Sequence, residues 1–232
     1  MTRRWIRTGV VAMACAALAA CGEAVIIREA GPGTEKTAVT IPSGGVVNPR
    51  NWPDACALIS DAEITGLLPQ AKRIQRTPEW VKIPPDEAFG GKAGAGLAPN
   101  GACKYSFTLP QNGDYKSGYE GSGGIRIDIA AVGDPKSVAG HFARTKSEYG
   151  QRNVVTEVDA KVFGAAECFA WVASGSSPRF TVCRRGPVMI ESLDVGFSYI
   201  DFENADRNTP AFKKIIDERL TPAFFRAATA NF

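Results

Sequence analysis

The chain has 232 residues and a formal net charge of +3 at pH 7, with 44% hydrophobic and 22% charged residues. This length and composition fit one globular domain of ordinary size with flanking segments. Three arginines lie in the first 20 residues, so residues 21–232 carry 24 basic and 24 acidic side chains. Such a balance lacks the basic face that nucleic-acid binding requires, and no run of basic residues indicates a polybasic membrane segment. We therefore expect no nucleic-acid partner.

The N-terminus has the three parts of a bacterial lipoprotein signal. Basic residues are followed by a short apolar run at 8–17, and the triplet Leu18-Ala19-Ala20 stands directly before Cys21. The apolar run is shorter than the roughly 20 residues that span a membrane. We predict that residues 1–20 are a signal peptide and that Cys21 carries a lipid, which anchors the protein to the outer face of the cell membrane. The alternative, an ordinary cleavable signal, leaves Cys21 as an unexplained reactive thiol.

Residues 21–51 are predicted to be a flexible tether. Glycine and proline are frequent here, and only a short apolar patch at 25–27 interrupts the polar sequence. A coil of about 30 residues has a reach of roughly 30 Å, enough to hold a domain clear of the lipid headgroups. The folded domain is then expected over residues 52–232.

Four cysteines remain for the domain: Cys56, Cys103, Cys168 and Cys183. An even number in an exported protein predicts disulfides, and three pairings are possible. Because Cys168 and Cys183 flank a predicted hairpin, we predict the sequential pairing, Cys56 with Cys103 and Cys168 with Cys183. A zinc site would need closely spaced cysteines or several histidines, and the sequence has neither. No metal or other cofactor is expected.

The domain begins with a predicted helix. Ser60 and Glu63 form the pattern of a capping box, in which each side chain accepts a hydrogen bond from the backbone of the other. Apolar residues then follow at helical spacing until Pro69 ends the helix. Residues 103–109 alternate apolar and polar side chains, which predicts a half-buried strand.

Residues 77–101, rich in proline and glycine, are predicted to be a long surface loop. Trp80 and Phe89 are candidate ligand-binding residues there, because aromatic side chains on such a loop can cover a cleft. The alternative is that they pack under their own loop. The segment Gly90-Gly91-Lys92 resembles a phosphate-binding loop, but Ala93 stands where that motif needs serine or threonine.

The rest of the chain alternates strands and helices. A strand at 124–132 precedes a helix that begins at Asp134-Pro135, and a C-terminal helix begins at Thr209-Pro210 and is interrupted at Thr221-Pro222. Further strands are expected at 154–158, 167–173, 179–184, 188–194 and 197–202. This order predicts an α+β domain, an antiparallel sheet with helices packed on one face.

Catalytic motifs are lacking. The one histidine, His141, has no evident nucleophile or orienting group, which favours a structural role. The serine of Gly121-Ser122-Gly123 lacks the preceding glycine of a nucleophile elbow, since Glu120 stands there. Asp201, Glu203 and Asp206 lack the spacing of a calcium loop. We therefore expect a protein that is not an enzyme.

Two motifs carry a family resemblance. Residues 54–63 read Asp-Ala-Cys-Ala-Leu-Ile-Ser-Asp-Ala-Glu before a short helix, and Cys103 is followed two places later by Tyr105. With the lipobox and the tether, they resemble the actinobacterial lipoproteins grouped as domain of unknown function 3558. A Cys-Ala-Leu-Leu-Thr-like start matches residues 56–60, and a Cys-x-Trp-like strand matches 103–105 with tyrosine in place of tryptophan. Over residues 52–230 the resemblance implies a secreted, lipid-anchored, disulfide-bonded α+β domain of unassigned biochemistry.

The function expected from the sequence is that of a carrier or sensor that binds an envelope lipid, glycan or small molecule. The alternative is an interaction or scaffold protein that regulates a membrane enzyme or secretion system, and a weaker alternative is an envelope hydrolase.

Overall fold

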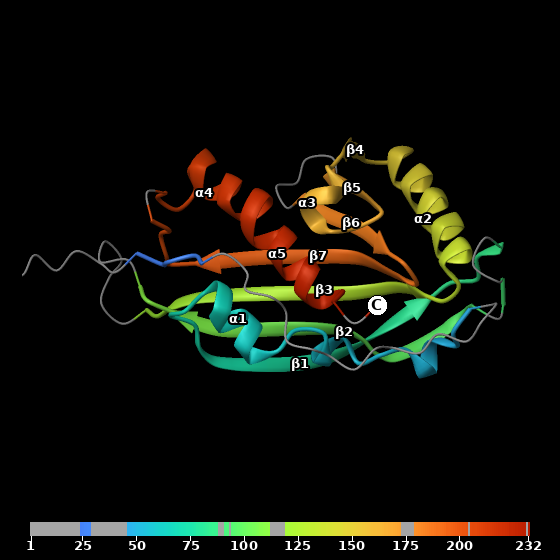
Figure 1. The fold of residues 1–232 in the computed structure, drawn as a ribbon, viewed down its shortest axis with the longest axis horizontal. Helices are drawn as coiled ribbons and strands as arrows, with labels where there is room; N and C mark the ends of the chain where they lie inside the picture. The colour runs from blue at the N-terminus through green and yellow to red at the C-terminus, as the bar shows by residue number, and fades with distance from the viewer. Residues whose placement is uncertain are drawn as a thin grey trace, which may run out of the picture.

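The computed structural model describes residues 24–28, 46–87, 91–92, 94–111, 119–172, 179–203, 205–230 and 232. Within these residues seven strands form one antiparallel sheet of order β1-β2-β3-β7-β6-β5-β4 (Figure 1). The strands are β1 (Lys72–Ile83), β2 (Gly96–Leu109), β3 (Gly121–Val132), β4 (Val154–Glu157), β5 (Glu167–Val172), β6 (Arg179–Arg185) and β7 (Val188–Ser198). The α-helices are α1 (Asp61–Leu67), α2 (Pro135–Gly150), α3 (Ala160–Phe163), α4 (Pro210–Ile215) and α5 (Thr221–Ala228). The single turns are η1 (Pro49–Asn51), η2 (Ala55–Ala57) and the π-helical η4 (Ile216–Leu220). The predicted α+β class with an antiparallel sheet is confirmed.

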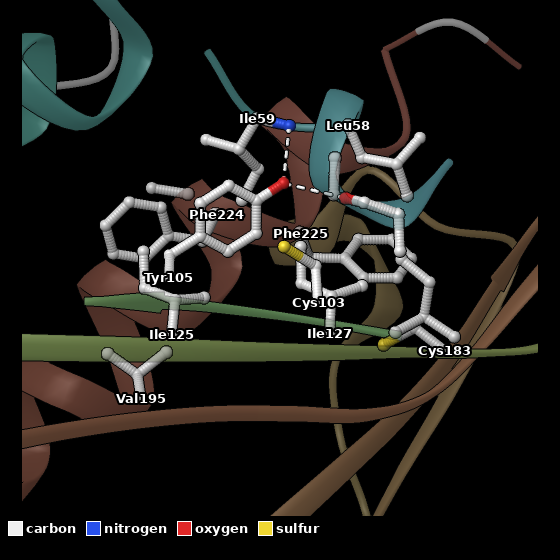
Figure 2. Packing of buried hydrophobic residues seen from close by; sticks show 14 of the residues in the cluster. Leu58, Ile59, Cys103, Tyr105, Ile125, Ile127, Cys183, Val195, Phe224 and Phe225 are labelled. Carbon is white, nitrogen blue, oxygen red and sulfur yellow. Dashed lines mark hydrogen bonds between the residues drawn. The ribbon is translucent and has the colours of Figure 1, made fainter. Parts of the chain in front are cut away.

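One face of β2 and β3 carries the main core. Tyr105 pairs with Ile125 across the two strands, both side chains are buried, and Phe224 and Phe225 of α5 lie over them (Figure 2). The intervening residues, such as Lys104 and Arg126, point to the other face, as alternation along a strand requires. The helical layer of α1, α4 and α5 is therefore built on this apolar face (Figure 1).

Helix α2 covers the opposite face at one end of the sheet, so the helices are not confined to one face as the sequence predicted. Ile129 of β3 pairs with Ile190 of β7, which pairs with Cys183, so the core face continues to the disulfide partner Cys168. Phe169 follows Cys168 and therefore points the other way. There it receives the ring of Phe142 from α2, with ring centroids 5.3 Å apart.

Both predicted disulfides are present. Cys56 of η2 is bonded to Cys103 of β2, with a sequence separation of 47, and Cys168 is bonded to Cys183 across the β5–β6 pair, with a sequence separation of 15. The first bond holds the segment before α1 against β2, the strand next to the edge strand β1. The second joins directly opposed residues of neighbouring strands.

Helix α1 begins as predicted. The Ser60 side chain accepts from the Glu63 N–H at 3.2 Å, and the Glu63 carboxylate accepts from the Ser60 N–H at 2.7 Å. Helix α2 has Asp134 as its N-cap and Pro135 in its first turn, again as predicted. In both cases a local side-chain hydrogen bond satisfies backbone donors that the helix leaves open.

The predicted surface loop over residues 77–101 is wrong. Residues 72–83 form β1, and β2 begins at Gly96. Strand β1 pairs with β2 on one side and is the edge of the sheet, where Pro78 is tolerated because its missing N–H removes no interior ladder bond. Trp80 lies in this strand beside a register irregularity between Glu79 and Val81, with 64% of its surface exposed. Phe89 lies outside the described residues.

Two further predictions are corrected. The strands expected at 188–194 and 197–202 form one strand, β7, which ends at Ser198. The C-terminal helix is not interrupted at Pro222, because the π-helical turn η4 precedes it and α5 continues the helix. A proline has no N–H and its ring collides with the carbonyl four residues earlier. The wider turn of a π-helix accommodates this loss without ending the helix.

Part of the stretch expected as a tether packs on the domain. Val25 is fully buried and forms a parallel bridge with Phe202. On the other side of the undescribed residues, Val46 pairs with Gly133, and the Trp52 indole donates to the Val47 carbonyl at 3.0 Å. The packed unit therefore extends N-terminally beyond residue 52. Among the described helices none has both the length and the apolar character to cross a membrane.

Candidate binding groove

A groove of about 700 Å³ lies between α2 and the sheet, at the end where β1 finishes. Its lining comes from α2 and the turn after it, from the end of β1, and from single positions of β3 and β7. The described lining residues are Lys82, Ile83, Pro84, Ala130, His141, Thr145, Glu148, Tyr149, Gln151, Arg152, Asn153 and Glu191. Most of these side chains are polar, and both signs of charge are present.

Tyr149 and Glu191 form the inner polar pair of the groove. The Tyr149 hydroxyl donates to the Glu191 carboxylate at 2.5 Å. The phenol ring of Tyr149 stacks on the ring of Trp171, with ring centroids 4.6 Å apart. Burial and the bond to Glu191 both raise the pKa of Tyr149 above that of an ordinary tyrosine. In this pair the phenol is the hydrogen-bond donor and the Glu191 carboxylate is the acceptor.

A charged row continues from the groove over the same face of the sheet. Arg126 of β3 contacts Glu79 of β1 at 2.5 Å and the Asp128 carboxylate at 3.0 Å. Burial is the main influence on Asp128 and raises its pKa, while its bonds to Arg126 act in the opposite direction. The outer face of β1 to β3 is thus a polar surface that leads into the groove.

His141 and Asp86 hold one wall in place. The His141 Nδ1 lies 2.5 Å from Asp86 Oδ2, and Arg144 Nη1 lies 2.5 Å from the second Asp86 oxygen. The side chains of His141 and Asp86 are only 12% and 10% exposed. Asp86 follows β1, so these two contacts fasten the segment after β1 to α2. The sequence did not reveal this partner of His141, because 55 residues separate the two.

The rim of the groove carries charges of both signs. Lys82 and Arg152 are exposed cations among the lining residues. Glu148 is an exposed anion that Arg144 approaches at 3.6 Å on the same helix face. Gln151 and Asn153, directly after α2, add amide groups that both donate and accept hydrogen bonds. This set of groups suits a ligand with many hydroxyl or amide groups.

The residues predicted as sites are not gathered in the groove. Trp80 is not among its described lining residues, although it stands two positions before Lys82 on β1. Phe89 and Cys21 lie outside the described residues. The four remaining cysteines form the two disulfides. Of the groove residues, the sequence singled out only His141, and it favoured a structural role for this residue.

Within the described ranges, no three side chains of histidine, cysteine, aspartate or glutamate are grouped so that they could hold a metal ion. Comparison of the chain with models of protein families, with curated proteins and with solved structures finds no match.

Proposed function

We propose that the protein is a lipid-anchored binding module of the cell envelope that holds a polar, hydroxyl-rich ligand, an envelope glycan, in the groove between α2 and the sheet. The groove itself carries the proposal: it is large enough for a small molecule and is lined by amides, carboxylates, cations and a phenol. The signal sequence and Cys21 support the location. The resemblance to lipid-anchored actinobacterial proteins supports the same class.

The lining favours a glycan over the acyl chain of a lipid. Ile83, Pro84 and Ala130 are the aliphatic residues of the described lining, and most of the others are charged or amide side chains. An acyl chain in this groove would cover these polar groups without forming hydrogen bonds to them, at a cost of about 1–3 kcal/mol for each group. A sugar can donate to Glu148, accept from Arg152 and exchange bonds with the amides.

Native mass spectrometry and calorimetry with oligosaccharides released from peptidoglycan test the proposal. The double variant Gln151→Ala/Asn153→Ala removes both amides, and we expect its affinity to fall about tenfold or more. The matched control Gln75→Ala/Asn100→Ala removes one glutamine and one asparagine from exposed positions on β1 and β2. Unchanged affinity in the groove variant, or equal losses in both variants, would contradict binding in the groove.

A second candidate function, an interaction protein, is favoured by one observation. Trp80 is 64% exposed on the edge strand β1, and a large aromatic side chain in such a place is typical of residues that dominate protein interfaces. Site-specific cross-linking from position 80 in cells tests this candidate. A discrete adduct that Gln151→Ala/Asn153→Ala leaves intact would favour it. Position 119, where Tyr119 is 56% exposed, serves as the control.

A further inference from the structure

The first described residues are fixed to the domain by several hydrogen bonds. The Val25 N–H donates to the Asp201 carbonyl at 2.8 Å, and the Glu203 N–H donates to the Val25 carbonyl at 3.3 Å. The Ile26 N–H donates to the Gln70 side chain at 2.7 Å, and the Arg28 N–H donates to the Leu67 carbonyl at 2.9 Å. With the Val25 side chain fully buried, this segment belongs to the core.

The predicted lipid-bearing residue is close to this fixed point. Cys21 precedes Val25 by four residues, and a chain of that length spans at most about 14 Å. A tether of 30 residues would have allowed the domain to move freely above the membrane. The position of Val25 instead holds the domain next to the lipid headgroups and restricts which of its surfaces can face them.

A cavity of about 480 Å³ lies beside this segment and is rich in arginine. The described residues that line it are Ile27, Arg28, Leu67, Val162, Glu218, Arg219, Ala223 and Arg226. They come from the N-terminal segment, α1, α3, η4 and α5, so residues far apart in the sequence meet here. This explains why the sequence shows no basic run although the fold has a basic cavity.

The three arginines of this cavity lack carboxylate partners among the described residues. Arg219 donates to the Ile27 carbonyl at 3.4 Å, and Arg226 donates to the Val162 carbonyl. Glu218 is the one carboxylate in the described lining, and Lys214 lies 3.8 Å from it on the neighbouring helical turn. The cavity therefore retains an excess of positive charge.

Apolar side chains accompany the arginines. Ile26 is 39% exposed next to the lining residue Ile27, and Val162, which lines the cavity, is 44% exposed. Exposed aliphatic groups beside cations are typical of surfaces that lie on a lipid bilayer, where the former enter the headgroup layer and the latter bind anionic lipids.

We infer that the cavity formed by Arg28, Arg219 and Arg226 binds the phosphate of an anionic phospholipid headgroup. This inference rests on the proposed anchor at Cys21, which places the cavity near the bilayer. The guanidinium groups of arginine offer paired donors that match phosphate oxygens, and phosphate supplies the negative charge that the described surroundings lack. The headgroup thus forms a second attachment of the domain to the membrane.

The resulting orientation displays the groove. In Figure 1 residues 24–28 (blue) lie towards one end of the long axis and α2 lies at the other. Strand β3 gives the distance between these two ends of the sheet. Ser122, which pairs with the last residue of β7, and Ala131, near the end of β3 that leads to α2, are nine residues apart, or about 30 Å. The arginine cavity is lined in part by α5 and lies on the face of the sheet that α5 covers, whereas α2 and the groove lie on the opposite face. A domain attached through the arginines therefore presents its groove away from the bilayer.

Vesicle co-sedimentation tests the inference. The chain from residue 21 with Cys21→Ser cannot be acylated and keeps every buried core residue that the structure describes, from Val25 to Ala228. We expect it to bind vesicles of phosphatidylcholine with phosphatidylglycerol and not vesicles of phosphatidylcholine alone. Arg219→Gln/Arg226→Gln should weaken this binding about 30-fold, since each cation near an anionic surface contributes roughly fivefold.

Controls separate the cavity from general charge and from folding. Lys104→Gln/Lys136→Gln removes the same charge from exposed positions on β2 and α2, and we expect less than a twofold change. Arg28→Gln alters a side chain that makes no hydrogen bond with a described residue, so it should weaken binding about fivefold without loss of folding.

The outcomes distinguish the two proposals. Equal losses in both double variants, or equal binding to neutral and anionic vesicles, would overturn the headgroup site. Because the assay uses an unacylated chain and no glycan, its result does not depend on binding in the groove. Acylation itself is tested by the mass of the full chain from cells and by release of a Cys21→Ala variant from the membrane fraction.

Discussion

The Tyr105 hydroxyl joins two distant parts of the core, and Tyr105→Phe should therefore be costly. The ring is fully buried, and its hydroxyl donates to the Ala55 carbonyl at 2.7 Å and accepts from the Ile59 N–H at 3.2 Å (Figure 2). Ala55 and Ile59 are also completely buried, so water cannot replace the lost bonds. A buried backbone group without a partner costs about 1–3 kcal/mol. We expect the free energy of unfolding in urea at pH 7 to fall by about 2–4 kcal/mol.

Alkaline pH offers an independent measure of the same group. Burial is the main cause that raises the pKa of Tyr105 to about 12, from about 10 in an unfolded chain. Because the folded-state pKa is the higher one, the full stabilisation is present below pH 10 and is lost as the pH rises through 12. The difference corresponds to roughly 3 kcal/mol. Between pH 10 and 12 the free energy of unfolding of the wild-type protein should fall by this roughly 3 kcal/mol. The Tyr105→Phe variant lacks the titrating group, so its free energy of unfolding should fall by roughly 3 kcal/mol less over the same range.

The exposed Tyr119 supplies the control. Tyr119→Phe removes a hydroxyl from a side chain that is 56% exposed and should change the free energy of unfolding by less than about 0.5 kcal/mol. If Tyr105→Phe cost no more than this control and kept the wild-type alkaline slope, the hydroxyl would not be the bonded link described here. The comparison of two tyrosines cancels effects of the aromatic ring that both variants retain.

The disulfides and the N-terminal segment give further predictions. Removing the bond between Cys56 and Cys103 by alanine substitution should cost about 4 kcal/mol in urea unfolding, against about 3 kcal/mol for Cys168 and Cys183, since the first closes the longer loop. The reverse order would show that the loop-entropy argument fails here. Val25→Ala should cost about 2 kcal/mol because a fully buried side chain is truncated, and a chain of residues 52–232 should be less stable still. Full stability of that shorter chain would contradict the place of Val25 in the core.

Local signals predicted much of this fold. The capping residues Ser60 and Asp134 act through hydrogen bonds within three residues, so the sequence reveals both helix starts. The alternation in β3 was equally readable, because Ile125 and Ile127 are buried while Arg126 between them is not. The disulfide pairing followed from a hairpin, which is also a local structure.

Strand β1 could not be predicted by the same means. It is an edge strand whose side chains are mostly exposed on both faces, so it has no alternation of apolar and polar residues. Pro78 and the glycines near β2 favour a loop in any local reading. The strand exists because β2 offers a long free edge, and its pairs are spread from Lys72 with Thr108 to Ile83 with Gly96. Such partners are visible only in the folded chain.

The groove was hidden for a similar reason. Tyr149 meets Glu191, and Asp86 meets His141, across separations of 42 and 55 residues. No residue type in these pairs is unusual by itself, and each reads as a surface or core residue in its own segment. The arginine cavity likewise joins Arg28 with Arg219, which donates to the neighbouring Ile27 across 192 residues. Functional candidates in this protein come from topology rather than from motifs.

The two ends of the stretch expected as a tether bear most directly on how the protein works. The Arg28 N–H donates to the Leu67 carbonyl at 2.9 Å, and the Val47 N–H donates to the Val132 carbonyl at 3.0 Å. Both ends of the intervening residues are therefore attached to the domain. With the proposed lipid at Cys21, only three residues therefore remain between the lipid and the fixed residue Val25. A long coil would have left the domain free to turn in any direction. In the proposed arrangement, a short link beside a basic, partly apolar surface limits the rotation of the domain, and the groove on the opposite face then opens away from the bilayer.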